Sequence, residues 1–235
     1  MSGILYLFPV NLAESPLEQV LPSYNLELVQ TIQHFIVEDV RTARRFLKQV
    51  NKAFDIDSCT FYILNQHSTS ETISEYMLPL LQGHSMGLLS EAGCPAIADP
   101  GADIVGMAQA KDIKVVPLVG PSSILLALMG SGFNGQRFAF EGYLPVEKEE
   151  RIKAIKRLEA RSYTEDMTQL FIETPYRNNK MLEDLVNTLR PQTQICVAFD
   201  LTGPTEHLHT RTVAAWKKHM PQLGKTPCIF LLYKG

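Results

Sequence analysis

Short apolar runs alternate with amphipathic segments along almost the whole chain, and this alternation limits the possible folds more than any other feature. In the first part of the chain the expected strands are residues 4–8, 35–37, 60–64, 86–89, 115–119 and 138–140. The expected helices are residues 40–50, 71–81, 104–110 and 122–130. A helix between two strands makes a crossover connection, which lets the strands run parallel. We therefore expect a mainly parallel sheet that helices cover on both faces.

The pattern changes after residue 144. A charged segment at 147–165 places Ile152, Ile155 and Leu158 at helical spacing. Strands are then expected at 169–173, 194–199, 207–213 and 228–233, with helices at 178–189 and 214–220. Some of these strands follow one another without a helix between them, which predicts a mixed sheet. The fold class is therefore α/β with two α/β domains, and we place them at 1–144 and 145–235 because Leu144 and Pro145 interrupt the pattern.

Composition excludes several classes of protein. Hydrophobic residues make up 45% of the chain and charged residues 20%, as in soluble globular proteins. The net charge of -3 argues against a surface that binds nucleic acid everywhere, although Arg41, Arg44, Arg45 and Lys48 lie close together. The four cysteines form no C-x-x-C pair, and no run approaches the roughly 18 apolar residues of a membrane span. Together these features predict a reducing, cytoplasmic protein that does not enter a membrane.

Glycine, proline and acidic residues concentrate in residues 90–101, which read SEAGCPAIADPG. This segment follows the expected strand 86–89 and precedes a helix, where ligands bind in an open parallel sheet. Connections of this kind usually have about 2–6 residues, so a segment of this length favours a binding loop over an ordinary connection. Its glycines let the backbone approach a ligand closely.

Three other strand ends carry similar residues. Residues 119–123 read VGPSS, and the start of the following helix offers free N–H groups to a ligand. Ser122 and Ser123 could equally serve only to cap that helix. Residues 173–177 read ETPYR and residues 198–204 read AFDLTGP. Four such strand ends suggest a cleft shared by both domains.

Two other patterns are discounted. Residues 130–135 match G-x-G-x-x-G, but the match follows a helix instead of a strand, so it is not expected to bind a phosphate. His207 and His209 alternate along an expected strand and share a face, but no third ligand is visible. We therefore expect no metal site.

The runs SEAGCPAIADPGADIV, VVPLVGPSSILLALMGSGF and FAFEGYLP resemble the signature of the tetrapyrrole methylase superfamily. The resemblance is closest to the branch that methylates a cytidine ribose 2′-hydroxyl in small-subunit ribosomal RNA. The E-D-x-R stretch of that branch is matched by Glu38, Asp39 and Arg41, and its E-T/S-P-x-R stretch by residues 173–177. The resemblance implies a tetrapyrrole-methylase-like fold, an S-adenosylmethionine cofactor, a ribosomal RNA or small-subunit partner and a homodimer.

The same resemblance implies the site residues. Those expected to bind the cofactor are Ala92, Gly93, Cys94, Pro95, Ile97, Asp99, Pro100, Gly101, Ser122, Ser123, Thr174, Pro175, Ala198 and Leu201. Those expected in catalysis are Arg41, Glu38 and Asp39. A methyl group on a sulfonium is electrophilic, so orientation of the nucleophile supplies much of the rate, and a ribose hydroxyl also needs a base nearby.

The chain departs from the family pattern on the side expected to face the substrate. The usual P-x-P-I-G-N-L loop is residues 8–12 here, without its glycine, and the usual H-E-H-N is residues 65–68, NQHS. The usual A-R-E-L-T-K is residues 198–203, AFDLTG, which lacks both cations. Two alternatives to an RNA methyltransferase therefore stay open: a methylase of a small molecule such as a tetrapyrrole, and a cofactor-binding protein without catalysis.

Overall fold

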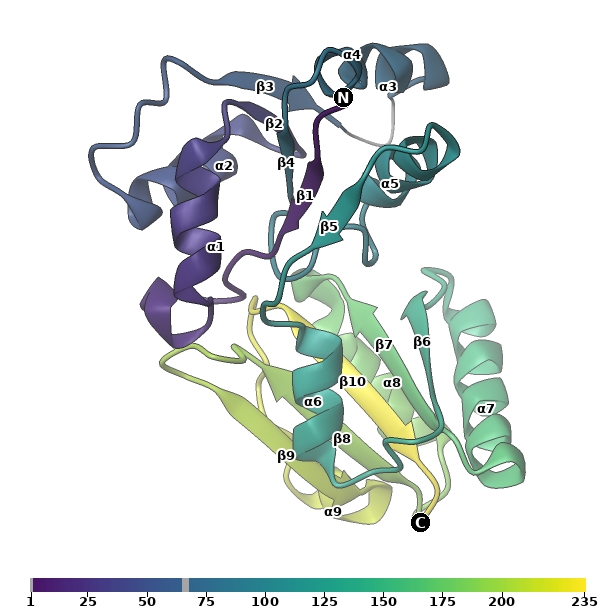
Figure 1. Cartoon of the computed structure of the whole chain (residues 1–235). Coiled ribbons are helices and arrows are strands. Elements are labelled where there is room, and N and C mark those ends of the chain that lie inside the picture. Colours follow the sequence, from purple (N-terminus) through teal and green to yellow (C-terminus); the bar gives the residue numbers. More distant parts are fainter. Residues whose placement is uncertain (1, 65–67) are drawn as a thin grey trace. The chain divides into compact units, whose positions relative to one another are not determined.

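The computed structural model describes residues 2–64 and 68–235. Their Cα positions divide into two compact units, unit 1 (Met1–Ser122) and unit 2 (Ser123–Gly235), which Figure 1 shows in purple to teal and in teal to yellow. Each unit contains one five-stranded sheet. Of the helices in the described part of the chain, none is long and apolar enough to cross a membrane.

The sheet of unit 1 is parallel throughout. Its strands are β1 (Leu5–Phe8), β2 (His34–Val37), β3 (Thr60–Ile63), β4 (Met86–Leu89) and β5 (Val115–Pro117), in the order β3-β2-β4-β1-β5. Every residue of β4 is buried because this strand lies at the centre of the sheet. The expected parallel sheet is confirmed.

Helices cover both faces of this sheet. They are α1 (Ser23–Leu28), α2 (Val40–Val50), α3 (Ser70–Tyr76), α4 (Leu78–Leu81) and α5 (Gly101–Ala110), with 3-10 turns η1 (Leu17–Gln19) and η2 (Val29–Thr31). Successive strand residues point to opposite faces, so Phe8 and Phe35 pack with α2 while Leu7 and Ile36 pack with α3, α4 and α5. Figure 1 shows these two groups of helices on either side of the strands.

Two local features of unit 1 differ from the expectation. The single helix expected at 71–81 is two helices, which separate at Met77, two residues before Pro79. Proline has no N–H to donate, and its ring is tolerated only in the first turn of a helix, where Pro79 lies in α4. The short helix α1 and the two 3-10 turns were not expected, because they are too short to show a periodic pattern.

The sheet of unit 2 is mixed. Its strands are β6 (Phe138–Tyr143), β7 (Thr168–Glu173), β8 (Gln194–Phe199), β9 (His207–Thr212) and β10 (Cys228–Tyr233), in the order β6-β7-β10-β8-β9. Strands β6 and β7 run parallel and the other pairs antiparallel, as the missing crossover helices predict. Strand β9 lies at one edge of the sheet.

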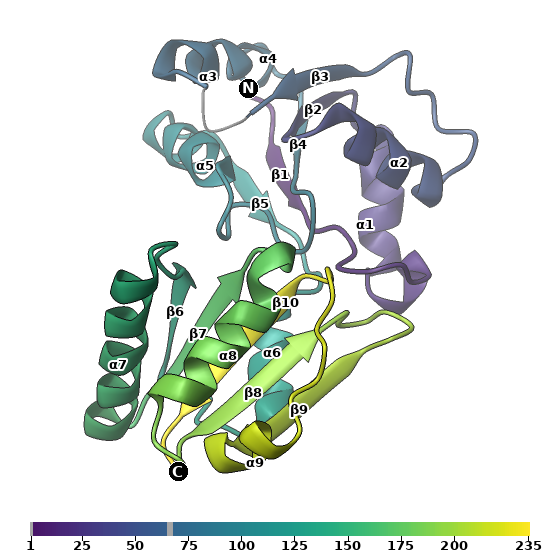
Figure 2. The ribbon, with the colours of Figure 1, turned by 180° about the vertical axis from the view of Figure 1, so that it is seen from behind.

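The helices of unit 2 are α6 (Ser123–Ser131), α7 (Lys148–Glu165), α8 (Asn178–Thr188) and α9 (Val213–Lys218), with the 3-10 turn η3 (Pro175–Arg177). Figure 2 shows α8 in front of the sheet and α6 behind it. The core between the sheet and helices α7, α8 and α9 contains Leu158, Phe171, Leu185, Trp216 and Phe230, all buried.

The division between the units comes at 122/123, earlier than the boundary predicted at 144/145. Strand β6 pairs with β7, with Phe138 opposite Thr168, and Thr210 donates a 2.7 Å hydrogen bond to the carbonyl of Ser131, the last residue of α6. Gly130 packs so closely against Leu208 that a Cβ there would lie 2.4 Å from it. Residues 123–143 therefore belong with unit 2. The predicted boundary differs because an alternating pattern of strands and helices does not reveal which sheet a strand joins.

Candidate functional site

The loop of residues 90–101 is tied to the end of β1. The N–H of Val10 donates to the carbonyl of Gly93 at 2.9 Å, and the N–H of Gly93 donates to the carbonyl of Val10 at 3.2 Å. Gly93 has φ +73°, and a Cβ there would lie 3.0 Å from Cδ2 of Leu12. Both polar backbone groups of Gly93 are therefore already bonded. A glycine at this position is also required by the left-handed backbone and by the neighbouring Leu12, whether or not a ligand approaches it.

Asp99 organises the second half of the loop. Its Oδ1 accepts hydrogen bonds from the N–H groups of Ala96 and Gly101, both at 2.8 Å. Ala96 and Ala98 have φ of 64° and 61°, a left-handed conformation that costs an alanine about 1–3 kcal/mol. A Cβ at Gly101 would lie 2.8 Å from the same Oδ1 and 2.9 Å from Leu88, so only glycine fits. The carboxylate thus holds a strained turn in one conformation.

The loop presents some of the predicted cofactor residues to solvent and buries others. Ala92 and Ile97 are exposed, whereas Cys94, Asp99 and Pro100 are half-buried. Pro95, Gly93 and Gly101 are buried, so they form the inner part of the loop. Ile97 is 53% exposed, which is high for an isoleucine and leaves an apolar surface that a ligand can cover.

The loop after β5 lies against the same edge. A Cβ at Gly120 would lie 2.3 Å from Cβ of Pro9, and the thiol of Cys94 lies 3.4 Å from the carbonyl of Pro121. Ser122 follows directly and Ser123 begins α6. The loops after β1, β4 and β5 therefore pack together, because β1 lies between the other two strands in the sheet. The structure thus brings together the two loops of unit 1 predicted to bind the cofactor.

Glu38 and Asp39 follow β2 at this same edge and differ in environment. Glu38 is half-buried, and burial raises its pKa, with the charges of Asp99 and Glu91 raising it further. Asp39 is exposed, and its Oδ1 accepts from the N–H and the hydroxyl of Thr42, both at 2.9 Å. The backbone N–H of Thr42 is the main cause of its lowered pKa. Asp39 is therefore the N-cap of α2.

The guanidinium of Arg41 is exposed and makes no ion pair in the described part of the chain. Arg44 instead lies over the ring of Phe61, with its Cζ 5.6 Å from the ring centroid. The charge of Arg41 acts on the neighbouring exposed carboxylate of Asp39, whose pKa it helps to lower. Arg41 therefore keeps its guanidinium at the sheet edge that carries Glu38 and Asp39, which makes it the better candidate of the two for contact with a substrate.

A cavity of about 220 Å³ opens between the loop after β1, helix α2 and the end of β4. Leu89, Phe46 and Val10 form an apolar floor. Polar and charged side chains around it include those of Glu14, Arg45, Gln49 and Glu91. Sequence reasoning missed this cavity, because its lining comes from three segments that are distant in the chain.

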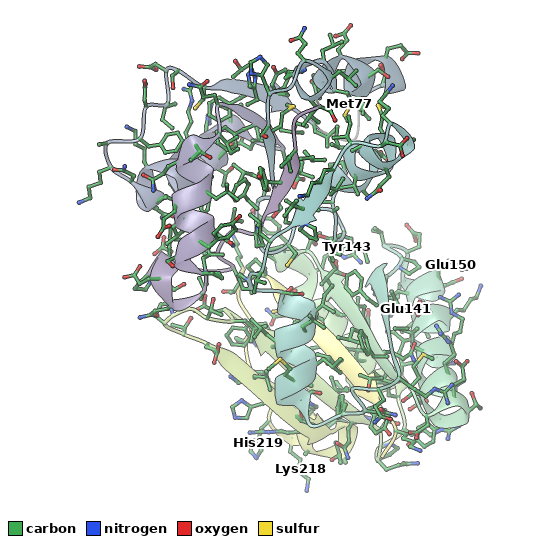
Figure 3. The ribbon with its side chains drawn as sticks, in the orientation of Figure 1. Met77, Glu141, Tyr143, Glu150, Lys218 and His219 are labelled. Carbon is green, nitrogen blue, oxygen red and sulfur yellow. The ribbon has the colours of Figure 1, made fainter. Side chains whose placement is uncertain are left out.

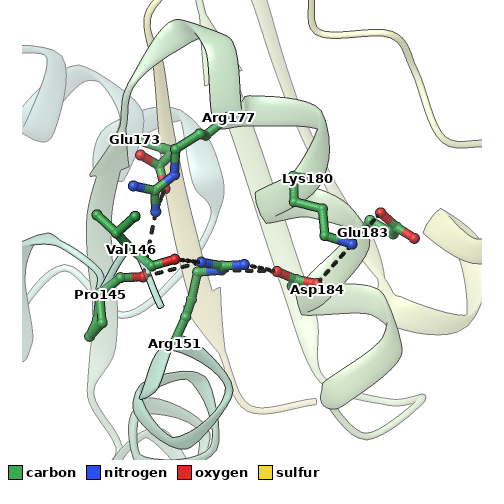
Figure 4. Close-up of polar contacts among 8 residues, drawn as sticks. All are labelled: Pro145, Val146, Arg151, Glu173, Arg177, Lys180, Glu183 and Asp184. Carbon is green, nitrogen blue, oxygen red and sulfur yellow. Dashed lines mark hydrogen bonds and ion pairs between the residues drawn. The ribbon is translucent and has the colours of Figure 1, made fainter. Parts of the chain in front are cut away.

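The predicted residues of unit 2 surround the end of β7. Thr174 precedes η3 and its N–H donates to Oε1 of Glu173 at 2.7 Å, while Pro175 is the first residue of η3. The buried carboxylate of Glu173 also forms a 2.7 Å ion pair with Arg177, as Figure 4 shows. The charge of Arg177 is therefore matched by that of Glu173.

Arg151 joins the segment before α7 to helix α8. Its Nε and Nη2 donate to Oδ2 of Asp184 at 2.9 and 2.6 Å, and its Nη1 donates to the carbonyls of Pro145 and Val146 (Figure 4). The side chains of Arg151 and Asp184 are only 6% and 5% exposed. The buried ion pair of Arg151 and Asp184 therefore fixes residues 145–146, which follow β6, beside the segment of residues 173–177.

Ala198 and Leu201, the other cofactor residues predicted in unit 2, are buried. Ala198 lies within β8, where it is paired with Ile229 and Leu208. Leu201 lies in the next loop, which Asp200 closes by accepting a 2.8 Å hydrogen bond from the N–H of Thr205. Asn65, Gln66 and His67, which replace the family's H-E-H stretch, lie outside the described residues.

Known proteins resemble the chain over most of its length. It is 32% identical over 222 residues to "Ribosomal RNA small subunit methyltransferase I" of Escherichia coli O157:H7, which covers 92% of this chain and 72% of that protein. The protein of the same name from Vibrio cholerae serotype O1 is 31% identical over 189 residues, covering 80% and 62%. That of Haemophilus influenzae is 29% identical over 213 residues, covering 91% and 71%.

The chain belongs to the ribosomal RNA small subunit methyltransferase I family. No family model matches it. The methyltransferase CobJ has a similar crystal structure, with a TM-score of 0.66 over the whole chain and 95% of CobJ at 14% identity. This likeness confirms the fold expected from the resemblance, and membership of the family confirms the expected methyltransferase. In the described residues, no group of three or more His, Cys, Asp or Glu side chains is placed to hold a metal ion.

Proposed function

We propose that the chain transfers the methyl group of S-adenosylmethionine to a ribose 2′-hydroxyl of small-subunit ribosomal RNA. The observation that carries this proposal is membership of the ribosomal RNA small subunit methyltransferase I family, and Glu38 adds a half-buried carboxylate beside the loop of residues 90–101. The printed names of the relatives supply the substrate class.

The residues present in unit 1 fit S-adenosylmethionine. Its sulfonium carries a positive charge, and three carboxylates lie at one sheet edge, those of Glu38, Asp99 and Glu91. Burial raises the pKa of Glu38 most, and repulsion by the other two carboxylates raises it further. Exposed apolar surface for the rest of the cofactor is available on Ile97 and Val119, which are 53% and 76% exposed. When bound, the cofactor supplies an electrophilic methyl group.

We infer that the cofactor contacts the residues named from the resemblance. In unit 1 these are Ala92, Gly93, Cys94, Pro95, Ile97, Asp99, Pro100, Gly101, Ser122 and, at the start of unit 2, Ser123. In unit 2 the resemblance also names Thr174, Pro175, Ala198 and Leu201, of which Ala198 and Leu201 are buried.

Glu38 acts in this proposal as the general base. A base works best when its pKa approaches the working pH, and burial with two neighbouring carboxylates moves the pKa of Glu38 in that direction. Asp39 does not share this role, since it caps α2 and its pKa is lowered. Arg41 is exposed and makes no ion pair within the described residues, so it offers a cation to a phosphate or hydroxyl of the substrate.

The test is tritiated methyl transfer from S-adenosylmethionine to small ribosomal subunits that lack the modification. Calorimetry with S-adenosylhomocysteine is run beside it, and we expect a micromolar dissociation constant, about -8 kcal/mol. Binding and transfer together support the proposal. Binding without transfer to subunits or free RNA would instead favour a small-molecule substrate or loss of catalysis.

A further inference from the structure

The charge of the chain is distributed very unevenly. Residues 207–235 contain Arg211, Lys217, Lys218, Lys225 and Lys234 and no Asp or Glu, a charge of +5. The whole chain has 22 basic and 25 acidic residues, so residues 1–206 hold 17 basic and 25 acidic residues, a charge of -8. A protein with a net charge of -3 thus carries one strongly basic segment.

Two of the five cations are held by contacts with residues outside β9 and α9. Lys234 forms a 2.9 Å ion pair with Asp166, and Lys225 lies 5.2 Å from the ring centroid of Tyr176. The remaining three are Arg211 on β9, and Lys217 and Lys218 at the end of α9, and none of them makes an ion pair in the described part of the chain. Lys218 and the adjacent His219 extend away from the sheet in Figure 3.

Aromatic rings lie beside these cations. His207 stacks on Phe199 with centroids 4.5 Å apart and an interplanar angle of 13°, and His209 stacks on His207 at 4.3 Å and 28°. His209 is exposed at the end of this stack. The buried Nε2 of His207 has no hydrogen-bond partner among the described residues.

The surface is held rigidly. Trp216 of α9 is fully buried, its indole N–H donates to the carbonyl of Ile195 at 3.0 Å, and Arg211 lies over the same ring at 5.2 Å. Thr212 caps α9 by accepting from the N–H of Ala215 at 3.2 Å. The anchored helix therefore keeps Lys217 and Lys218 beside the edge strand.

We propose that the β9–α9 surface, formed by His207, His209, Arg211, Lys217, Lys218 and His219, binds a single-stranded segment of RNA. Phosphates would contact the cations, and an unpaired base would stack on His209, because every base has a face that aromatic rings can stack on. This proposal rests on the proposed function, since it assumes an RNA substrate. Charged residues on an edge strand also prevent it from pairing with other chains. A mixture of acidic and basic residues would serve that role equally well, so it does not by itself explain cations without matching acids.

The experiment uses fluorescence anisotropy of a labelled single-stranded oligouridine and of an RNA duplex with the full-length chain. The test variant is Lys217→Gln/Lys218→Gln. The matched control is Lys156→Gln/Arg157→Gln, which removes the same charge from exposed residues of α7. We expect the test variant to reduce the slope of log affinity against log salt by about 1.4, or about 0.7 for each of two phosphates. The control should leave the slope unchanged.

His209→Ala tests the stacking part. It should weaken binding of the single strand by about fivefold or more while leaving duplex binding unchanged. Melting temperature and binding of S-adenosylhomocysteine should match the wild type for all variants. The KM for small ribosomal subunits should rise with Lys217→Gln/Lys218→Gln, and kcat should not change.

The outcomes separate the two proposals. Methylation of subunits by the wild type, with an unchanged slope and KM in Lys217→Gln/Lys218→Gln, would overturn the β9–α9 surface and leave the proposed function standing. Equal losses of RNA affinity in the test and control variants would also overturn the β9–α9 surface, because net charge alone would then explain the loss. A change of oligomeric state in the test variant would show that the surface meets another copy of the chain instead. Neither binding nor methylation of RNA by the wild type would overturn both proposals.

Discussion

At the scale of single residues, Glu38 and Asp39 show how neighbouring carboxylates acquire different chemistry. Glu38 lies at the sheet edge beside Asp99 and Glu91, so its charged form is disfavoured. Asp39 faces solvent and accepts two hydrogen bonds from Thr42, so its charged form is favoured. The E-D-x-R stretch therefore contains one candidate base and one helix cap.

Glu38→Gln should reduce kcat by about 10²–10⁴-fold, because general base catalysis contributes that much. In the wild type, kcat/KM should rise with pH through a pKa above the ordinary 4.5 of a glutamate, and Glu38→Gln should lack this limb. The pKa of Glu38 is higher in the folded state than in the unfolded state. The free energy of unfolding therefore falls as pH rises from the unfolded-state pKa through the folded-state pKa. Glu38→Gln should therefore not be less stable at neutral pH. Full activity in this variant would remove Glu38 from catalysis.

Arg41→Ala should weaken methyl transfer far more than Arg44→Ala. Arg44 lies over Phe61, so its loss should cost about 0.5–1 kcal/mol of stability, whereas Arg41 has no such contact. Tritiated transfer to small subunits measures the first effect and urea unfolding the second. Charge reversal at Arg45 should act mainly on RNA affinity. Wild-type transfer by Arg41→Ala would contradict the role given to the E-D-x-R stretch.

At the scale of elements, the loop of residues 90–101 is held by its own side chains and backbone before any ligand binds. Asp99 satisfies two N–H groups and keeps Ala96 and Ala98 in left-handed conformations, and Gly93 is bonded to Val10. Gly93→Val, which should abolish cofactor binding, would also press on Leu12 and strain φ, so it is a poor test of contact with the ligand.

Asp99 allows a sharper test of this loop. Asp99→Ala leaves the N–H groups of Ala96 and Gly101 unpaired, at a cost of about 1–3 kcal/mol, whereas Asp99→Asn keeps an acceptor oxygen. We expect Asp99→Ala to lower affinity for S-adenosylhomocysteine more than tenfold, and Asp99→Asn to lower it less. Calorimetry on both variants, with melting temperatures as the control, decides this. Equal affinities for the wild type and Asp99→Ala would show that the cofactor does not depend on this loop.

The buried pair of Arg151 and Asp184 should matter for the stability of unit 2. Arg151→Met leaves the carboxylate of Asp184 buried with only Lys180 beside it, at 3.4 Å, and should lower the free energy of unfolding by about 3–5 kcal/mol. Arg151→Met/Asp184→Leu should recover much of this loss, because no unpaired charge remains. Urea unfolding of both variants measures the difference. A double variant less stable than the single one would contradict this account.

At the scale of the whole molecule, the chain is expected to form a homodimer, chiefly because its family resemblance implies one. Light scattering at low micromolar concentration should give about 53 kDa, twice the 26.4 kDa of one chain. A mass near that of a single chain would refute the dimer. The same measurement on Lys217→Gln/Lys218→Gln tells whether the β9–α9 surface contributes to assembly.

The sequence by itself determined the elements and the order of the candidate loops. Helix α2, strand β4 and strand β8 lie where periodicity predicts, because the burial of one face leaves a repeat in the local sequence. The loop of residues 90–101 was visible because glycine and proline interrupt that repeat. The resemblance then led from these residues to the methyltransferase family.

Only the tertiary structure decided what lies next to what. It pairs β6 with β7 and so moves the boundary from 144 to 122, and it places Glu38 beside Asp99 and Glu91, which are more than fifty positions away in the chain. It also assigns Asp39 to a helix cap, forms the cavity beside α2 and matches Arg177 with Glu173. These facts depend on strand order and side-chain packing between distant segments, and such pairings leave no periodic trace in a single sequence.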